Sequence, residues 1–387
     1  MNMMNVLTYL CPTKIYMGIN AHKKLKEIIA EQKVKHLFLM CDPGVVSGEI
    51  YQFVENILKD NHVTFDVFTE IEPDPSTQTV DKAYEICRTT RPSILLALGG
   101  GSTMDAAKAA GILATNGGRI QDYEGNDKFK NPPLPLIAIP TTAGTGSEVS
   151  YVCVITDTER ATKMPIRSAA LNRAQIAILD PVALTSLPEK AAAHAAMDAF
   201  VHALESYVSL QANPITDAVN LHAIELIAQN VRSFVSNRSH LEAGFHMLCA
   251  ATLAGMGFSN TGLGNIHCMA RLVGAFFHVP HGLSNAVCLP YVAEFNLVAN
   301  PEKFARVALA MGEKIQGLTG LEAGRKAIEA IKQMNRDWDI PMKLREIGVT
   351  ADRLPEMARL AFESDYNRWN PRYTTVEDFR SLFEKAF

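Results

Sequence analysis

The feature that most constrains the fold of this chain is a change in the spacing of its apolar residues near the middle. Before residue 181, short apolar runs alternate with segments of helical periodicity. The runs are HLFLMC (36–41), VTFDVF (63–68), ILLAL (94–98), LPLIAI (134–139) and AQIAILD (174–180). Strands that alternate with helices are typical of an α/β layer with a mainly parallel sheet. The sequence therefore predicts an α/β domain in the N-terminal half.

After Pro181 the apolar residues recur at helical spacing, as in residues 215–235 and 301–315, which predicts an all-α C-terminal half. A chain of 387 residues is too long for one ordinary core. The prolines and polar residues of DPVALTSLPEK (180–190) separate the two patterns. We therefore expect one domain at 1–183 and a second at 184–387.

Charge and composition narrow the class of protein. The net charge of -4 comes from mixed basic and acidic residues without long runs of one sign, which argues against a nucleic-acid partner. The N-terminal segment MNMMNVLTYLCPTKIYMG contains Pro and Lys before any apolar stretch reaches membrane-spanning length. The seven cysteines are scattered without CxxC spacing, as small buried side chains in a reducing compartment are. We expect a cytoplasmic protein that does not bind membranes.

Two turns that follow apolar runs have the composition of a ligand-binding loop. The run ILLAL leads into Gly99, Gly100, Gly101 and Ser102 and then into a helical pattern. Free N–H groups and absent side chains at such a turn let a pyrophosphate approach, although a plain turn has the same composition. Asp105 has capping-box spacing to Ser102 and could serve the N–H groups of its own helix.

The second turn, PTTAGTGSE (140–148), follows LPLIAI and supplies hydroxyl groups without bulk, but it lacks the Gly-Lys-Ser/Thr of a P-loop. Asp42 directly follows HLFLMC, where a carboxylate can accept hydrogen bonds from a ribose and repel a 2′-phosphate. These residues favour NAD over NADP.

Four residues of the C-terminal half have the spacing of a metal site. Asp198 and His202 are one helical turn apart and share a face, which alone is more typical of a structural hydrogen-bonded pair. His267 lies early in a helical stretch, and His281 is expected in a Pro-His-Gly turn. Three imidazoles and one carboxylate suit Fe²⁺ or Zn²⁺, and a site without cysteine favours a catalytic Lewis acid.

The other histidines are assigned no function. His194 precedes Asp198 by four residues and could share its face, so its place in the site stays open. Six others lie in helical or polar surroundings and show no partners in the sequence: His22, His36, His62, His222, His240 and His246.

The motifs GGGSTMDAAKA, PTTAGTGSEV, MDAFVHALESYVS, NIHCMAR and VPHGLSNAVCLPYV together resemble the iron-containing (group III) alcohol dehydrogenases. The resemblance runs from PTKIYMG to Asn370-Pro371-Arg372 and is strongest to the branch of 1,3-propanediol dehydrogenase and lactaldehyde reductase. It implies a Rossmann-like N-terminal domain, a helical metal-binding C-terminal domain and a homodimer or larger homo-oligomer. The implied activity is NAD(H)-dependent hydride transfer to or from a short-chain alcohol or diol.

The resemblance also implies roles for individual residues. The four metal ligands would be Asp198, His202, His267 and His281, and Phe258 would lie beside the nicotinamide and the substrate pocket. The NAD contacts would be Asp42, Asp74, Gly99, Gly100, Gly101, Ser102, Asp105, Thr141, Thr142, Thr145 and Lys163.

Two departures from the family pattern stand out. Arg271 replaces the histidine that most members carry four residues after the third ligand, and Ala195-Ala196 replaces the usual Thr or Ser followed by Gly. A guanidinium cannot shuttle protons but can hold an anion by paired hydrogen bonds. Arg271 could therefore bind a carboxylate, sulfonate or phosphonate on an aldehyde substrate, or form a salt bridge to a neighbouring carboxylate.

Two other classes of function compete with the dehydrogenase. A lyase like dehydroquinate synthase shares the architecture and uses NAD without net turnover, but its ligand set has a Glu in place of this Asp. A non-catalytic assembly protein would not need an intact set of metal ligands.

Overall fold

A computed structural model describes residues 6–160 and 162–387 of the chain. It divides into two compact units. The first comprises Leu10–Leu187 together with Asn237–Leu248, and the second includes Pro188–Ser236 and Cys249–Phe387. The main division therefore falls within the polar and proline-containing segment at 180–190.

The first unit is built on a six-stranded parallel sheet with the order β1-β9-β6-β4-β2-β3. The strands are β1 (Lys14–Met17), β2 (His36–Cys41), β3 (Thr64–Phe68), β4 (Ile94–Gly99), β6 (Leu136–Pro140) and β9 (Ile176–Leu179). All five predicted strands are present. The central ones are buried on both faces, which explains why their sequences are continuous apolar runs.

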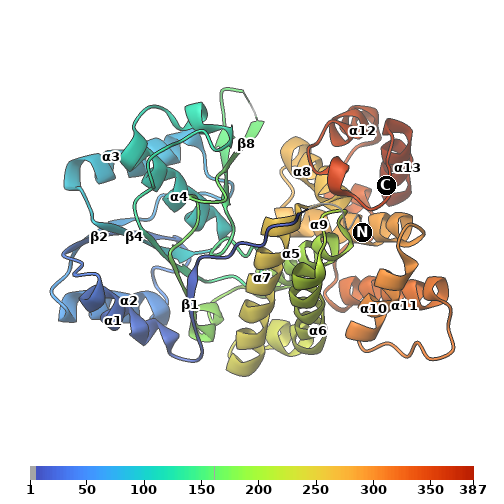
Figure 1. Cartoon of the computed structure of the whole chain (residues 1–387), viewed down its shortest axis with the longest axis horizontal. Helices are drawn as coiled ribbons and strands as arrows, with labels where there is room; N and C mark the ends of the chain where they lie inside the picture. The colour runs from blue at the N-terminus through green and yellow to red at the C-terminus, as the bar shows by residue number, and fades with distance from the viewer. Residues whose placement is uncertain (1–5, 161) are drawn as a thin grey trace. The chain divides into compact units, whose positions relative to one another are not determined.

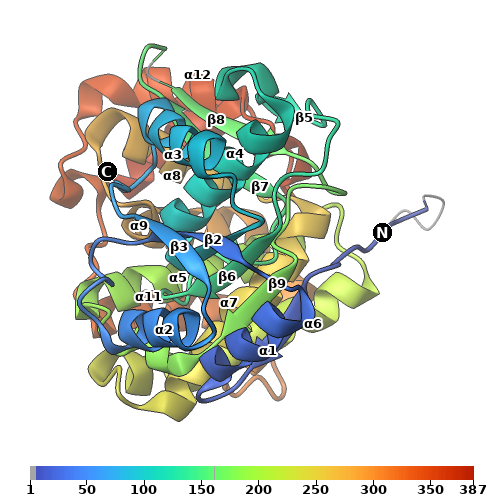
Figure 2. The ribbon, with the colours of Figure 1, turned by 90° about the vertical axis from the view of Figure 1, so that its left-hand side faces the viewer.

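Two pairs of helices cover the two faces of this sheet (Figures 1 and 2). The helices are α1 (Lys24–Glu31), α2 (Glu49–Asp60), α3 (Thr77–Thr90) and α4 (Gly101–Asn116). In β2, Leu37 and Leu39 share a core with α1 and α2, while Phe38 and Met40 share a core with α3 and α4. This alternation follows the two-residue period of a strand.

The order of the strands places a topological switch point between β2 and β4. From β2 the chain moves outward to β3, and then it returns to β4 on the other side of β2. Ligands of open α/β sheets bind at such a point, beyond the carboxyl ends of the strands. Asp42 and Gly99–Ser102 lie at these two ends.

A small second sheet lies beside α4, with the order β5-β8-β7. Its strands are β5 (Gly125–Asn126), β7 (Val152–Asp157) and β8 (Thr162–Arg167), and β7 pairs with β8 in antiparallel register. It brings Lys163 opposite Thr156.

The second unit is helical, as predicted, and its helices are α5 (Glu189–Val208), α6 (Pro214–Ser236), α8 (Asn265–Phe277), α9 (His281–Leu297), α10 (Pro301–Ala310), α11 (Gly320–Asp337), α12 (Leu354–Phe362) and α13 (Val376–Ala386), with short 3₁₀ turns between them. Helix α5 is buried almost throughout its second half and packs on α6 and α9. It therefore forms the centre of the helical core.

Helix α7 (Leu241–Thr261) is long and apolar enough to cross a membrane by length and composition alone, and no other helix of the described residues is. Buried core helices of water-soluble proteins pass the same test, and 56% of its most apolar window is buried here. We read α7 as a core helix.

Candidate functional site

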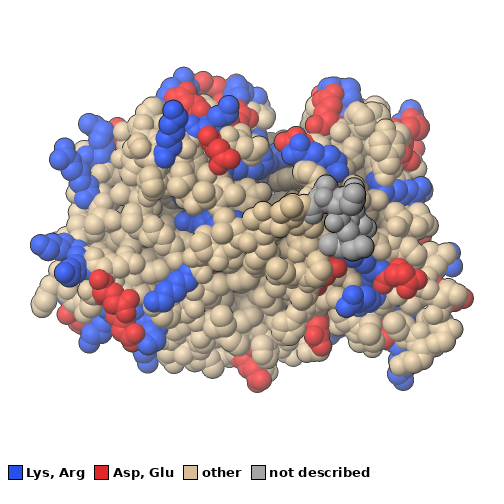
Figure 3. Space-filling model, in the orientation of Figure 1, with Lys and Arg blue, Asp and Glu red and all other residues tan. Residues whose placement is uncertain are grey.

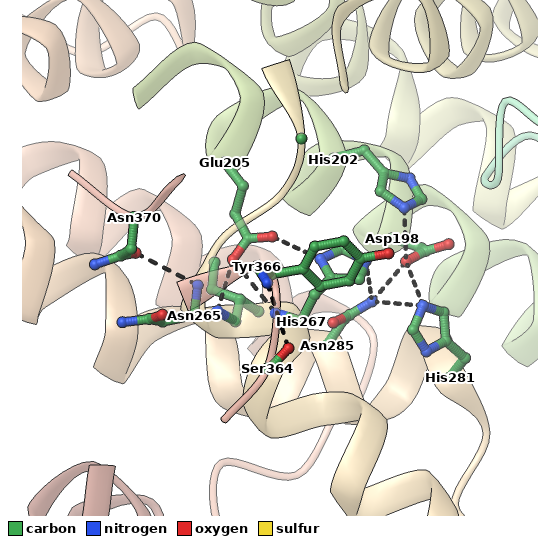
Figure 4. A network of polar contacts seen from close by, with 12 residues as sticks. Asp198, His202, Glu205, Asn265, His267, His281, Asn285, Ser364, Tyr366 and Asn370 are labelled. Carbon is green, nitrogen blue, oxygen red and sulfur yellow. Dashed lines mark hydrogen bonds and ion pairs between the residues drawn. The ribbon is translucent and has the colours of Figure 1, made fainter. Parts of the chain in front are cut away.

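Four side chains from three helices of the second unit form one cluster (Figure 4). Asp198 and His202 come from α5, His267 from α8 and His281 from α9. Their ligand atoms all lie within 4.8 Å of one another. The Oδ1 atom of Asp198 is 3.8 Å from Nε2 of His202 and 3.7 Å from Nε2 of His281. The prediction that His281 lies in a turn is wrong by one residue, because it opens helix α9 after Pro280.

Asp198 is held in its charged form although it is buried. Burial raises the pKa of its carboxyl, but His202, His281 and His267 outweigh burial and lower this pKa below its ordinary value of 3.8. A carboxylate among imidazole nitrogens is a donor set that suits Fe²⁺ or Zn²⁺.

Asn285, one turn after His281 on α9, contacts three of the four residues of the cluster. Its Nδ2 atom donates to Oδ1 of Asp198 at 2.7 Å and lies 3.3 Å from Nε2 of His267 and 3.2 Å from Nε2 of His281. The Oδ1 atom of Asn285 is buried without a hydrogen-bond partner. A carboxylate oxygen and two imidazole nitrogens thus converge on one amide group. The same atoms are the donor types that a divalent metal ion accepts, so the residues fit such an ion.

Glu205 fixes the orientation of His267. Its Oε2 atom is 2.6 Å from Nδ1 of His267, and its Oε1 atom accepts from the backbone N–H of Ile266 at 2.6 Å and of His267 at 3.3 Å. A carboxylate at a helix N-terminus is favourable because the free N–H groups carry partial positive charge. With its proton on Nδ1, His267 presents the lone pair of Nε2 to the cluster. A carboxylate on the other ring nitrogen is the usual support for a metal-binding histidine.

A buried amide network anchors the start of α8. Asn370 accepts from the backbone N–H of Asn265 at 3.4 Å and from Nδ2 of Asn296 at 2.9 Å, and Asn265 donates to Thr374 at 2.8 Å. The late Asn370-Pro371-Arg372 motif therefore supports the helix that carries His267.

The predicted nucleotide-binding residues of the first unit meet at the carboxyl edge of the sheet. The backbone N–H of Asp42 donates to Leu98 at 3.0 Å, and that of Thr141 donates to Gly99 at 3.1 Å. The ends of β2, β4 and β6 are thereby tied together at the switch point.

The glycines after β4 are required by close packing of the second turn. A Cβ atom on Gly100 would lie 3.2 Å from Cγ2 of Thr142, and one on Gly101 would lie 2.8 Å from Cγ2 of Thr145. Neither glycine has a positive φ. The absent side chains thus allow the threonine turn to approach the start of α4.

Asp74, Ser102 and Lys163 form a second group at this edge. Nζ of Lys163 is 2.8 Å from Oδ2 of Asp74, and the backbone N–H of Asp74 donates to Oγ of Ser102 at 3.1 Å. Residues from three separate segments are thus brought together, as the resemblance implies for a cofactor site.

Asp105 does not cap its own helix, contrary to one of its two predicted roles. Helix α4 has Gly100 at its N-cap without a side-chain bond, and Asp105 instead accepts from Oγ of Ser147 at 3.1 Å and from the N–H of Val154 at 3.0 Å. Burial raises the pKa of Asp105 to about 6, although Lys108 opposes that rise.

Buried Lys108 binds the segment that follows the threonine turn. Its Nζ atom donates to the carbonyl oxygens of Ser147, Ser150 and Val152 at 2.7, 3.1 and 3.0 Å, and it also contacts both serine hydroxyls. Burial lowers the pKa of Lys108. The sequence analysis missed this residue, because its spacing gives no sign of its partners.

Comparison with known proteins identifies the family. Residues 12–181 match the model of iron-containing alcohol dehydrogenase, and residues 192–387 match the model of the C-terminal part of the Fe-containing alcohol dehydrogenase family. The chain belongs to the iron-containing alcohol dehydrogenase family.

Members of this family are similar to the chain over nearly its full length. The 1,3-propanediol dehydrogenase of Klebsiella pneumoniae is 39% identical over 382 residues, with 98% of each chain covered. The NAD-dependent methanol dehydrogenase of Bacillus methanolicus is 34% identical over 378 residues, covering 98% of this chain and 99% of that one. The lactaldehyde reductase of Escherichia coli K12 is 33% identical over 374 residues, covering 96% and 97%.

Solved structures of the family have the same fold as this chain. A 1,3-propanediol oxidoreductase superposes with a TM-score of 0.96 at 38% identity, covering 99% of this chain and 100% of that one. A sulfoacetaldehyde reductase from Bifidobacterium kashiwanohense in complex with NAD⁺ gives 0.89 at 26% identity, covering 99% of both. These matches confirm the predicted fold class and the predicted NAD-dependent, iron-containing oxidoreductase. They favour this function over the alternatives of a lyase and a non-catalytic assembly protein.

Three aromatic and charged residues of this family member lie around the cluster. The ring of Phe258 is 4.6 Å from that of His202, and the ring of Tyr366 meets that of His267 edge-on at 6.3 Å. The guanidinium of Arg271 lies over the ring of Tyr366 at 5.5 Å.

Histidines outside the cluster have other surroundings. His194 lines a separate cavity of about 660 Å³ with Trp338 and Phe277. The prediction that the remaining histidines have no partners is wrong for several: His22 pairs with Asp180 at 2.6 Å, and His36 with Asp66 at 2.8 Å. These pairs lie within the first unit and serve its structure.

Glu205 and Asn285 contact the cluster, and sequence reasoning missed both. Glu205 follows His202 by three residues and Asn285 follows His281 by four, so each shares a helix face with a ligand. That spacing was a usable signal, but it is also common for polar residues that have no role in a site.

Proposed function

We propose that this protein is an NAD(H)- and Fe²⁺-dependent alcohol dehydrogenase or aldehyde reductase that acts on a short-chain alcohol or diol. The observation that carries the proposal is the convergence of Asp198, His202, His267 and His281 within 4.8 Å. These four residues would hold the ion, with Zn²⁺ as the substitute that the same ligands accept. A divalent ion held there supplies Lewis acidity toward the oxygen of the substrate.

The residues around the cluster would prepare the site for that chemistry. Glu205 holds the imidazole of His267 in one orientation, so that the cluster needs little rearrangement. Phe258 packs against His202 and would give the substrate pocket an apolar wall. Partial exclusion of water would strengthen the electrostatic contacts inside the pocket.

We propose that the first unit binds NAD through the switch point of its sheet. Asp42, Gly99–Ser102, Asp105, Thr141, Thr142, Thr145, Asp74 and Lys163 would form this site. The start of α4 offers free N–H groups to a pyrophosphate. The carboxylate of Asp42 would accept from the ribose and select against NADP. In this proposal residues 1–183 form the nucleotide-binding domain and 184–387 the metal-binding domain.

We also propose that the enzyme works in the cytoplasm as a homodimer or larger homo-oligomer, without nucleic-acid or membrane partners. On the face shown in Figure 3, basic and acidic side chains are interspersed, which supports the absence of a nucleic-acid partner. Light scattering after size-exclusion chromatography tests the oligomer.

The decisive experiment follows NADH oxidation by the Fe²⁺-reconstituted protein with 3-hydroxypropanal and lactaldehyde. We expect turnover with NADH that greatly exceeds turnover with NADPH and that a chelator abolishes. His281→Ala should lose bound iron and activity together, while His222→Ala, an exposed residue of α6, should retain both. Turnover that survives the chelator and His281→Ala would overturn the proposal.

A further inference from the structure

We infer that Arg271 binds an anionic group of the substrate, so that the preferred substrate is a short aldehyde carrying a carboxylate, sulfonate or phosphonate. The inference rests on the proposed function and specifies its substrate class. It is carried by where the guanidinium lies and by the absence of a carboxylate to neutralise it.

Helix α8 places Arg271 on the same side as the metal cluster. Arg271 follows His267 by four residues, so the two side chains share a helix face one turn apart. Tyr366 contacts both: its ring meets His267 edge-on at 6.3 Å and lies under the guanidinium at 5.5 Å. One aromatic ring thus bridges the ligand and the arginine.

The charge of Arg271 is not balanced by the carboxylates of its surroundings. Among the described residues, no Asp or Glu oxygen forms an ion pair with it. Glu205 is committed to His267 and to the N–H groups that start α8, and Asp198 belongs to the cluster. The alternative of a structural salt bridge is therefore not what the structure shows.

A guanidinium that lies over an aromatic ring still has N–H groups at its edge for a planar anion. Carboxylate, sulfonate and phosphonate oxygens match this fork, which binds them by two parallel hydrogen bonds. Arg271 is only partly buried, so the side chain is not closed off from solvent. The guanidinium therefore offers one anion site beside the metal ligands.

The separation along α8 sets the length of the substrate. Four residues of helix rise about 6 Å, so a carbonyl oxygen at the cluster and an anion at Arg271 would be about that far apart. A chain of two to four carbons spans this distance. The reaction itself is unchanged: NADH gives a hydride to the carbonyl carbon, a solvent proton goes to the oxygen, and the anionic group takes no part.

The test compares aldehydes of similar length with and without an anionic group. Steady-state kinetics use sulfoacetaldehyde, phosphonoacetaldehyde and succinate semialdehyde against glycolaldehyde and butanal, with wild type, Arg271→Met, Arg271→Lys and Arg271→His. Arg271→Met should raise KM for the anionic aldehydes by about 10- to 100-fold, the effect of losing hydrogen bonds to a charged group. The ratio of kcat/KM for anionic aldehydes to kcat/KM for neutral aldehydes should fall by about the same factor, because neutral aldehydes have no group for the guanidinium to bind.

The other variants define the chemistry of the contact. Arg271→Lys keeps the charge without the fork and should give an intermediate KM. Arg368→Met is the matched control, since Arg368 is exposed and lies over Trp369 at 4.7 Å, and it should leave all constants unchanged. The aldehydes with a sulfonate, a phosphonate and a carboxylate are also compared with one another. The anionic group that Arg271 binds best should show the largest rise in KM when Arg271 is replaced.

Calorimetric titration of the reconstituted protein with 2-hydroxyethanesulfonate gives a readout independent of turnover. Wild type should bind it at least about 10-fold more tightly than Arg271→Met does. The inference would be overturned if wild type and Arg271→Met bound 2-hydroxyethanesulfonate equally well. It would also be overturned if wild type preferred neutral aldehydes and Arg271→Met had the same kinetic constants. Either result would leave the proposed dehydrogenase activity intact. Absence of turnover with every aldehyde would instead overturn the proposed function, and the titration would still decide whether Arg271 binds an anion.

Discussion

In the helical unit, the spacing of residues in the sequence predicted the metal ligands but not the residues that support them. Asp198, His202, His267 and His281 were chosen from the sequence because three imidazoles and a carboxylate are a chemically coherent set, and the structure brings all four together. Their supports were not found. Glu205 contacts His267, which lies 62 residues further along the chain, and spacing within α5 carries no information about that partner.

At this scale, we predict that Glu205→Gln weakens metal binding by roughly 10- to 100-fold, because a neutral amide supports the imidazole of His267 less well than a carboxylate does. Competition of the apoprotein with a fluorescent chelator for Zn²⁺ measures the affinity. Glu225→Gln on α6 is the control, since Glu225 is exposed and contacts the exposed His222 and Gln229 of its own helix. Unchanged affinity in Glu205→Gln would remove the orienting role.

Strands of the main sheet were predicted well from the sequence because they are continuous apolar runs. HLFLMC coincides with β2, and ILLAL and LPLIAI lie within two residues of β4 and β6. The β7–β8 hairpin was not predicted, because alternate residues of both strands are only partly buried and β8 contains Pro165 and two basic residues. Half-buried strands of this kind carry a weak apolar signal.

The junction between β4 and α4 makes a prediction at the scale of elements. Gly101→Ala puts a methyl group 2.8 Å from Cγ2 of Thr145, so the threonine turn must shift. We expect a cost of about 1–3 kcal/mol in the free energy of unfolding and weaker NADH binding.

The double variant Gly101→Ala/Thr145→Ser removes the clashing methyl group and should recover part of both losses. Urea denaturation and NADH fluorescence titration provide the two measurements. No recovery in the double variant would show that packing against Thr145 is not the reason for the glycine.

The buried pair of Asp180 and His22 ties the short 3₁₀ turn before α1 to the end of β9. Asp180 accepts from the N–H groups of Asn20, His22 and Val182 and from the imidazole of His22. Burial raises the pKa of Asp180, but the hydrogen bonds from His22 and Val182 outweigh it and lower this pKa below 3.8. Its stabilising effect is therefore fully present above pH 3.8 and is lost as the pH falls through the lower folded pKa.

Asp180→Asn should accordingly lower the free energy of unfolding by about 1–3 kcal/mol at pH 7, the usual cost of weakening the hydrogen bonds of buried polar groups. The difference in the free energy of unfolding between wild type and Asp180→Asn should become smaller below about pH 4. Urea unfolding at pH 7, 5 and 3.5 measures it. Asp66→Asn, which breaks a half-exposed pair with His36, should cost at most about 1 kcal/mol. A difference in the free energy of unfolding that does not change with pH would contradict the stabilising role of the ionised Asp180 carboxylate.

For the whole molecule, the proposed metal should contribute to thermal stability. A ligand present at about 100 times its dissociation constant stabilises the folded state by about 2.7 kcal/mol, which corresponds to roughly 5–10 °C in a unit of this size. We expect a chelator to lower the unfolding temperature by that amount and added Fe²⁺ or Zn²⁺ to restore it. Asp198→Ala should melt at the same temperature with and without chelator in scanning calorimetry.

The order of the cluster residues along the chain has a consequence for biosynthesis. His281 lies 83 residues after Asp198, so the set is complete only after all three helices that carry the ligands have been synthesised. Asp198 and His267 already have protein partners in Asn285 and Glu205. The helices can therefore pack before any ion arrives, and iron would be acquired by an already folded enzyme. A cell short of iron would then accumulate a stable, inactive reserve of this protein that becomes active when the metal returns.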